Sequence, residues 1–118
     1  MKNERVLIAD DQAVVRNGVI QVIETFGEDM GHQVVGEAAS VSEVEQLMKS
    51  GLRPTVALVD GKFPSHGDGA RAAAIIEKFS PKTVIIAFST DDQTYGREQW
   101  NKHSSSQELV DNLTNLKH

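Results

Sequence analysis

Short apolar runs alternate with segments of helical periodicity along this chain of 118 residues. The first run, residues 6–9 (VLIA), is too brief for a buried helix and suits a strand that is covered on both faces. Residues 12–28 then carry apolar side chains at helical spacing, namely Val15, Val19, Val22, Ile23 and Phe26. Because Gly27 helps to end this helix, the pattern predicts one strand followed by one helix.

The same alternation continues along the chain. Strands are expected within residues 32–38 (HQVVGEA), 55–61 (TVALVDG) and 83–89 (TVIIAFS). Helices are expected within residues 40–51 and 70–79. Strands that alternate with helices in this way predict an α/β fold, with a doubly wound parallel sheet that has helices on both faces.

Two pairs of residues have the spacing of a helix capping box, in which a Ser is followed three residues later by a Glu. Ser40 with Glu43 marks the start of the helix expected within residues 40–51. Ser105 with Glu108 marks a last helix near the end of the sequence. One face of this last helix carries Leu109, Val110, Leu113 and Leu116.

The periodicity weakens between Ser89 and Lys102. Residues 90–100 (TDDQTYGREQW) are polar and lack a helical stripe, whereas residues 98–101 suit a last edge strand. The connection between two parallel strands normally has a dozen or more residues and includes a helix. Here residues 90–101 must provide both the connection and the last strand. We therefore predict a loop or at most one helical turn and a poorly covered side of the sheet. Trp100 would be a reporter near any partner contact there, or an anchor in that contact.

Composition limits the classes of function. The net charge is −5 and the 12 Lys and Arg residues are scattered, so no direct contact with nucleic acid is expected. The absence of Cys excludes a disulfide framework, a thiolate metal site and a Cys nucleophile. No apolar run is long enough for a signal peptide or a membrane span. We expect a single cytoplasmic domain over residues 1–118, without membrane contact.

Charged and polar residues follow the predicted strands at the point where each strand ends. Asp10 and Asp11 follow the first strand, Asp60 ends the third, Ser89 ends the fourth, and Lys102 follows the last. In a doubly wound sheet the carboxyl ends of the strands line a common crevice, so we expect these side chains to lie together.

The residue types in this group favour a phosphoryl acceptor with a magnesium ion. Three neighbouring carboxylates repel one another unless a cation lies among them, and oxygen ligands without His or Cys favour Mg²⁺. The Lys102 ammonium and the Ser89 hydroxyl suit phosphoryl oxygens. An Asp carboxylate can itself form an aspartyl-phosphate.

Four segments in order, "VLIADDQ", "ALVDGKFPSHGDG", "IIAFS" and a late lysine before a capped helix, resemble the receiver domain of bacterial two-component response regulators. The resemblance spans nearly the whole chain. It implies a flavodoxin-like five-stranded parallel sheet in the order 2-1-3-4-5, here with a fourth helix that is short or missing. It also implies a phosphoacceptor that signals through a downstream protein partner and is not an enzyme beyond self-catalysed phosphotransfer and dephosphorylation.

Transferred by position, the resemblance gives each site residue a role. It implies that Asp60 accepts a phosphoryl group from a histidine kinase or a histidine phosphotransfer protein. Mg²⁺ would be held by Asp10, Asp11, Asp60 and the backbone carbonyl of Lys62. Ser89 would occupy the switch Ser/Thr position, and Lys102 would pair with the phosphoryl group.

This sequence departs from the receiver pattern near the last strand. His103 follows Lys102 where the family usually has Pro, and Gln99 stands three residues before Lys102, where an aromatic switch residue is common. In receivers the fourth helix, fifth strand and fifth helix commonly form the output surface. The short segment after Ser89 therefore implies another output surface, or an unusual one.

Other interpretations remain open. A receiver-like interaction module, with output uncoupled from phosphorylation, also fits the short segment after Ser89. A small Mg²⁺-dependent phosphatase shares the aspartates but needs a substrate cap for which the chain has no room. Residues 67–72 (GDGARA) match a dinucleotide-binding fingerprint, but they do not directly follow a strand. Taken alone, Asp10 and Asp11 also fit a helix cap, and Asp60 fits a turn.

Overall fold

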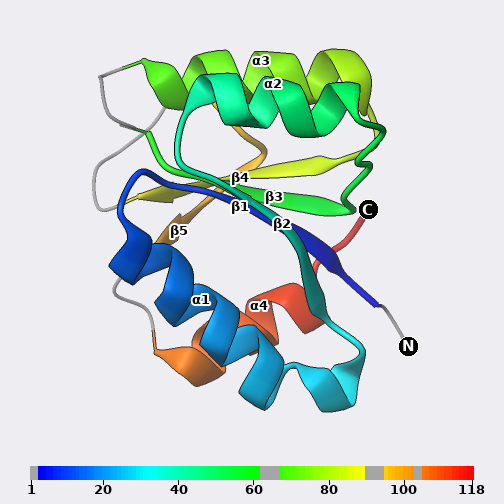
Figure 1. Cartoon of the computed structure of the whole chain (residues 1–118). Coiled ribbons are helices and arrows are strands. Elements are labelled where there is room, and N and C mark those ends of the chain that lie inside the picture. Colours follow the sequence, from blue (N-terminus) through cyan, green and yellow to red (C-terminus); the bar gives the residue numbers. More distant parts are fainter. Residues whose placement is uncertain (1–2, 62–66, 90–94, 103–104) are drawn as a thin grey trace.

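A computed structural model describes residues 3–61, 67–89, 95–102 and 105–118 of the chain. Its centre is a five-stranded sheet in the order β2-β1-β3-β4-β5, with every neighbouring pair parallel (Figure 1). The strands are β1 (Arg5–Ala9), β2 (Gln33–Ala38), β3 (Val56–Val59), β4 (Val84–Ser89) and β5 (Glu98–Asn101). The predicted sheet type and strand order are confirmed.

Helices cover both faces of the sheet. They are α1 (Ala13–Phe26), α2 (Val41–Lys49), α3 (Asp68–Phe79) and α4 (Ser106–Thr114), with a short 3-10 turn at Glu28–Met30. Figure 1 shows α2 and α3 on one face and α1 and α4 on the other. Both predicted capping boxes form, because the backbone N–H of Glu43 donates to Ser40 Oγ at 3.2 Å and that of Glu108 to Ser105 Oγ at 3.1 Å.

Two apolar cores lie on the two faces of the sheet, and the strands supply both. Val6 and Ile8 of β1 join the core beneath α1 and α4, whereas Leu7 and Ala9 join the core beneath α2 and α3. Successive side chains of a strand point to opposite faces, so a strand buried on both sides needs an uninterrupted apolar run. Phe26, which shares the helical spacing of α1, is exposed at the end of that helix.

The segment between β4 and β5 contains no helix in the part that the structure describes, residues 95–97. These residues form bends, and the backbone N–H of Arg97 donates to Ile85 O at 2.8 Å. On the α2 and α3 face, Ile85 is only half-buried and Gln99 is exposed. The fourth helix of the receiver pattern is thus short or missing as predicted, and α4 follows β5.

The prediction for Trp100 is wrong. Its side chain is only 7% exposed and packs in the core beneath α1 and α4, with Phe88, Leu109 and Leu113. Its indole N–H donates to Glu98 Oε1 at 3.1 Å. The alternation along β5 directs Trp100 to the well-covered face of the sheet, so this residue is not an anchor on the thinly covered face.

A buried histidine connects the first strand to the last helix. The backbone N–H of Glu4 donates to His32 Nδ1 at 3.1 Å, so the ring donates from Nε2 to Thr114 Oγ1 at 3.1 Å. Thr114 in turn donates to the carbonyl of Val110 at 2.9 Å. Burial lowers the pKa of His32 below its usual 6.5, although the nearby Glu4 carboxylate opposes this shift.

We expect His32 to make the fold less stable in mild acid. The unfolded chain binds a proton on this ring near pH 6.5, whereas the folded chain binds it only at lower pH. The free energy of unfolding therefore falls as pH decreases below about 6.5, until the folded ring is also protonated. Urea unfolding of native and His32→Asn protein at several pH values measures this, and equal pH dependence of the two would contradict it.

No helix of the described part of the chain has the length and the apolar run needed to cross a bilayer.

Candidate acidic site at the carboxyl edge of the sheet

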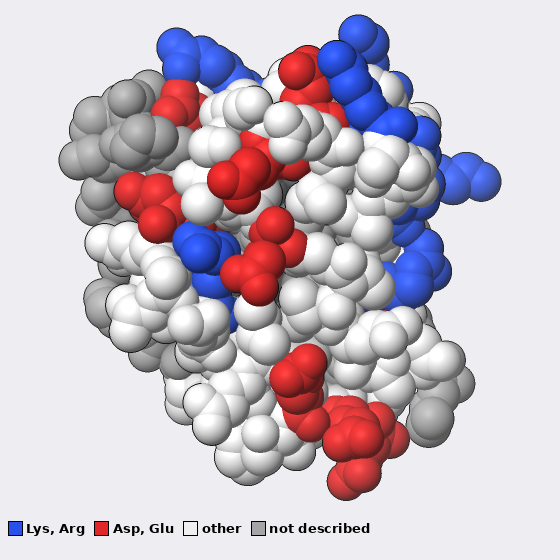
Figure 2. All heavy atoms as spheres, in the orientation of Figure 1, with Lys and Arg blue, Asp and Glu red and all other residues white. Residues whose placement is uncertain are grey.

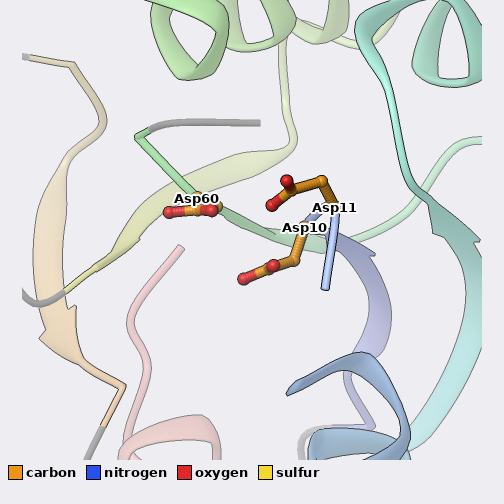
Figure 3. A group of neighbouring side chains, drawn as sticks. All are labelled: Asp10, Asp11 and Asp60. Atoms are coloured by element: carbon orange, nitrogen blue, oxygen red, sulfur yellow. The ribbon is translucent and has the colours of Figure 1, made fainter. Parts of the chain in front are cut away.

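Three aspartates gather where β1 and β3 end (Figure 3). Asp10 and Asp11 follow β1 directly, and Asp60 follows β3. One carboxylate oxygen from each of the three lies within 4.8 Å of the others. Asp10 and Asp60 are buried, whereas Asp11 is exposed. The sheet therefore brings together the three carboxylates that the sequence predicted to meet.

The backbone at this edge is held in place by hydrogen bonds that continue the sheet. The N–H of Asp60 donates to Ala9 O at 2.9 Å, and that of Asp10 donates to Ala38 O at 3.0 Å. Asp10 Oδ1 accepts the N–H of Gln12 at 2.9 Å, as a residue just before a helix often does. This bond forms a turn before α1 and not a helix cap, because the N-cap of α1 is Gln12 and no side chain caps it. Asp10 Oδ2 remains for other contacts.

Lys102 joins the two buried aspartates. Its Nζ lies 2.6 Å from Asp10 Oδ2 and 3.1 Å from Asp60 Oδ1. Burial alone would lower the pKa of Lys102, but the carboxylates of Asp10 and Asp60 outweigh it and raise the pKa above its usual 10.5. The ammonium is therefore charged at neutral pH and sits in contact with the candidate phosphoacceptor.

The acidic group has the chemistry of a site for a hard divalent cation. Its ligands are all carboxylate oxygens, which suit Mg²⁺ better than softer metals. Asp10 Oδ2 is buried against the Lys102 ammonium, 2.6 Å away. Three carboxylates around one ammonium leave negative charge that a second cation would balance.

Of two further predicted site residues, the structure describes Ser89 but not Lys62. Ser89 is the last residue of β4, is buried, and lies in register with Asn101 of β5. It is therefore at the same edge of the sheet as the aspartates. Lys62, which the resemblance implies as a backbone ligand, lies outside the described residues.

Two residues of this region were missed from the sequence. The Tyr95 hydroxyl donates to Val59 O at 2.6 Å, next to Asp60; burial and then the Asp60 charge raise its pKa. Arg16 donates to Asp10 O at 2.8 Å and pairs with Glu37 at 2.9 Å. An aromatic side chain within a polar segment is a signal for Tyr95, but nothing in the sequence indicates the contacts of Arg16.

The glycines before α3 have a structural explanation. Gly67 precedes the helix with φ of 87°, a conformation that favours glycine. A Cβ at Gly69 would lie 2.4 Å from Asp60 O and 2.6 Å from the Tyr95 hydroxyl. The glycines of residues 67–72 thus serve the turn and the close approach of α3 to the end of β3, and a dinucleotide site is not needed to explain them.

Comparisons with known proteins agree with this geometry. The family model described as "Response regulator receiver domain" matches residues 6–110. The chain is 34% identical over 89 residues to the "Probable transcriptional regulatory protein NarL" of Mycobacterium tuberculosis, covering 75% of this chain and 39% of that protein. It is 35% identical over 92 residues to the "Oxygen regulatory protein NreC" of Staphylococcus haemolyticus, covering 77% and 41%.

A solved structure shows the same fold. The signal receiver domain of the putative response regulator NarL from Mycobacterium tuberculosis superimposes with a TM-score of 0.76 at 28% identity, covering 94% of this chain and 93% of that one. The chain spans only about two fifths of the length of the curated relatives. The match over residues 6–110 and the shared strand order establish that the chain belongs to the response regulator receiver domain family.

Proposed function

We propose that this chain is a phosphoacceptor in two-component signalling and that Asp60 is the residue phosphorylated. The observation that carries the proposal is the position of Asp60. Its carboxylate lies 3.1 Å from the Lys102 ammonium, and one of its oxygens lies within 4.8 Å of carboxylate oxygens of Asp10 and Asp11. The donor would be the phosphohistidine of a histidine kinase or of a histidine phosphotransfer protein.

In the proposed transfer, a carboxylate oxygen of Asp60 attacks phosphorus while the bond from phosphorus to the histidine nitrogen breaks. Lys102, already in contact with Asp60, would neutralise charge on a phosphoryl oxygen, and Ser89 would donate its hydroxyl. Arg16 and Gln12 hold Asp10 in position through its carbonyl and its Oδ1. A bound Mg²⁺ would supply charge neutralisation among Asp10, Asp11 and Asp60.

Members of this family accept a phosphoryl group rather than turning over a substrate as a classical enzyme does. For this chain we propose self-catalysed phosphotransfer and dephosphorylation, in the cytoplasm, with output through a protein partner. Direct contact with nucleic acid is not part of the proposal, although the relatives are named as regulators of transcription. The chain matches less than half of the length of those relatives.

A second candidate function is an interaction module whose output does not depend on phosphorylation. The described part of the β4–β5 segment lacks a helix, and Gln99 stands at the aromatic switch position, which favours this alternative. The two candidates differ in one property, because only the first requires the surface to change when Asp60 is phosphorylated.

We expect Mg²⁺ to stabilise the native fold by binding among the three aspartates. Binding to the folded chain alone raises the melting temperature, and the rise grows with the logarithm of the Mg²⁺ concentration once this exceeds the dissociation constant. The rise should be much smaller in Asp11→Ala, because this exposed carboxylate is a free ligand in the group. Thermal melts with and without MgCl₂ test this, and equal rises in both proteins would remove Asp11 from the metal site.

The proposal is tested by incubating the chain with a small phosphodonor such as acetyl phosphate and measuring the intact mass. We expect a gain of one phosphoryl group in the presence of Mg²⁺ and little or none with a chelator. A chain that gains no mass with Mg²⁺ and excess phosphodonor would refute the phosphoacceptor function. Amide NMR spectra of the same samples separate the two candidates, since only a switching receiver shows shifts beyond the site.

A further inference from the structure

A continuous groove runs between α3 and the start of β4. One part has a volume of about 810 Å³ and lies at the end of α3, where Phe79 forms a wall. The other part has a volume of about 550 Å³ and extends to Tyr95 and Arg97. Both parts share Pro81, Lys82 and His118, so they form one feature, which we call the α3–β4 groove. It begins at the amino ends of β1, β3 and β4, opposite the edge that carries Asp60.

The α3–β4 groove is positively charged on a negatively charged protein. Arg5, Arg53, Lys82 and Arg97 line it, whereas Glu77 is the one acidic side chain among its described lining residues. The whole chain carries a net charge of −5. Figure 2 shows Lys and Arg gathered along the edge where α2 and α3 end. Positive charge is thus concentrated on this side of a protein whose net charge is negative.

Capping of helix ends explains only part of this charge. Arg53 donates to the carbonyls of Met48 and Leu52, and Arg5 donates to the carbonyl of Arg53. These bonds fix both guanidinium groups but do not neutralise them. Arg5 and Arg53 form no ion pair with a carboxylate of the described chain.

The two cations nearer to Tyr95 are also poorly neutralised. Lys82 is exposed and makes no hydrogen bond or ion pair with another described residue. Arg97 lies 3.9 Å from the exposed Glu98 carboxylate, a pair that water screens well. His118 is already engaged, because its Nε2 lies 3.0 Å from the buried Glu4 carboxylate. Arg97 also donates to the carbonyl of Lys117, which does not neutralise its charge. The groove therefore presents cations that no buried carboxylate of the described residues neutralises.

The walls between these cations are apolar. The Phe79 ring has the Arg53 guanidinium 5.9 Å from its centroid, and Pro81, Ala73 and Ile85 complete much of the lining. Alternating cations and small apolar surfaces match an extended peptide that alternates carboxylates with short aliphatic side chains. The acidic remainder of the chain disfavours a long polyanion such as a nucleic-acid backbone, which reaches beyond the groove, more than a short acidic segment that stays within it.

We propose that the α3–β4 groove is a docking surface for an acidic, extended segment of a partner protein. This goes beyond the proposed function and does not rest on it, because the groove exists without phosphorylation. Its cations are Arg5, Arg53, Lys82 and Arg97, and only its Tyr95 end approaches the Asp60 site. It replaces the expected output surface with one built from α3, β4 and the segment at Tyr95.

The test uses fluorescence anisotropy with the unmodified chain and two labelled peptides, one of alternating Glu and Ala and one of alternating Gln and Ala. We expect saturable binding of the Glu peptide and about tenfold weaker binding of the Gln peptide, as for the loss of several partly exposed charge pairs. Amide NMR shifts should map to Phe79, Lys82 and Arg97. Equal binding of both peptides, or shifts elsewhere on the surface, would overturn the proposal.

Two double variants with equal loss of charge separate the groove from the overall charge. Lys82→Gln/Arg97→Gln should weaken binding of the Glu peptide about tenfold. Lys49→Gln/Arg71→Gln removes one Lys and one Arg outside the groove and should leave binding nearly unchanged. Equal weakening by both variants, or tighter binding of a DNA duplex than of the Glu peptide, would overturn the proposal. The peptide comparison holds even if a variant unfolds.

Discussion

Replacing Lys102 with Met should lower the free energy of unfolding by about 3 kcal/mol when divalent cations are absent. The Lys102 ammonium contacts both Asp10 and Asp60, and all three side chains are at most 14% exposed. Met fills a similar volume without charge, so the variant keeps two buried carboxylates and loses the cation between them. Removing one partner of a buried ion pair is strongly destabilising for this reason. Urea unfolding in the presence of a chelator measures the change.

The same variant should respond more strongly to Mg²⁺ than the native chain does. In Lys102→Met a bound Mg²⁺ takes over the charge neutralisation that the ammonium provides in the native chain. Its binding should therefore restore much of the lost stability. Lys49→Met is the matched control, because Lys49 is exposed and its one ion pair among the described residues is with Glu45 at 3.8 Å. A Lys102→Met chain that is as stable as the control in chelator would show that Asp10 and Asp60 do not depend on this ammonium.

The second large effect is expected at Gly69. An alanine Cβ there would lie 2.4 Å from Asp60 O and 2.7 Å from Gly61 Cα, and both of these are backbone atoms that cannot rotate away. Gly69→Ala should therefore force α3 from the end of β3 and lower the free energy of unfolding by about 2 kcal/mol. Because the strain falls on Asp60 itself, phosphorylation by a small phosphodonor should also slow.

Gly18→Ala provides a control of opposite sign. Gly18 lies in the middle of α1, and beyond the adjoining backbone of the helix a Cβ at this position meets no described atom within 4 Å. Alanine there should stabilise the fold by about 0.5–1 kcal/mol through helix propensity alone. Thermal or urea unfolding of Gly69→Ala and Gly18→Ala measures both changes in stability. Similar effects of the two substitutions would mean that the close approach of α3 to Asp60 does not constrain the fold.

The sequence correctly predicted that three aspartates would lie together, because these residues directly follow β1 and β3. Parallel strands place their carboxyl ends at one edge, so locating Asp10, Asp11 and Asp60 along the chain was enough to bring them together. The two capping boxes gave the starts of α2 and α4 by the same kind of local rule. Local patterns with a fixed geometric meaning were thus the reliable part.

The features that the sequence did not predict depend on contacts between segments that are far apart along the chain. The face to which β5 directs Trp100 follows from its register with β4, which no local pattern reveals. The hydrogen bond of Tyr95 to Val59 joins residues 36 positions apart, and that of His32 to Thr114 joins residues 82 apart. Such bonds form only after the sheet and the helices are in place, so periodicity and spacing could not predict them.

The central claim is that Asp60 carries the phosphoryl group, and chemical trapping of the modified residue tests it most directly. After incubation with a phosphodonor and Mg²⁺, borohydride reduces an aspartyl-phosphate to homoserine, which peptide mass mapping then locates. We predict homoserine at position 60 in the native chain and at no position in Asp60→Asn. Homoserine at Asp10 or Asp11 in the native chain, or trapping that persists in Asp60→Asn, would contradict the account.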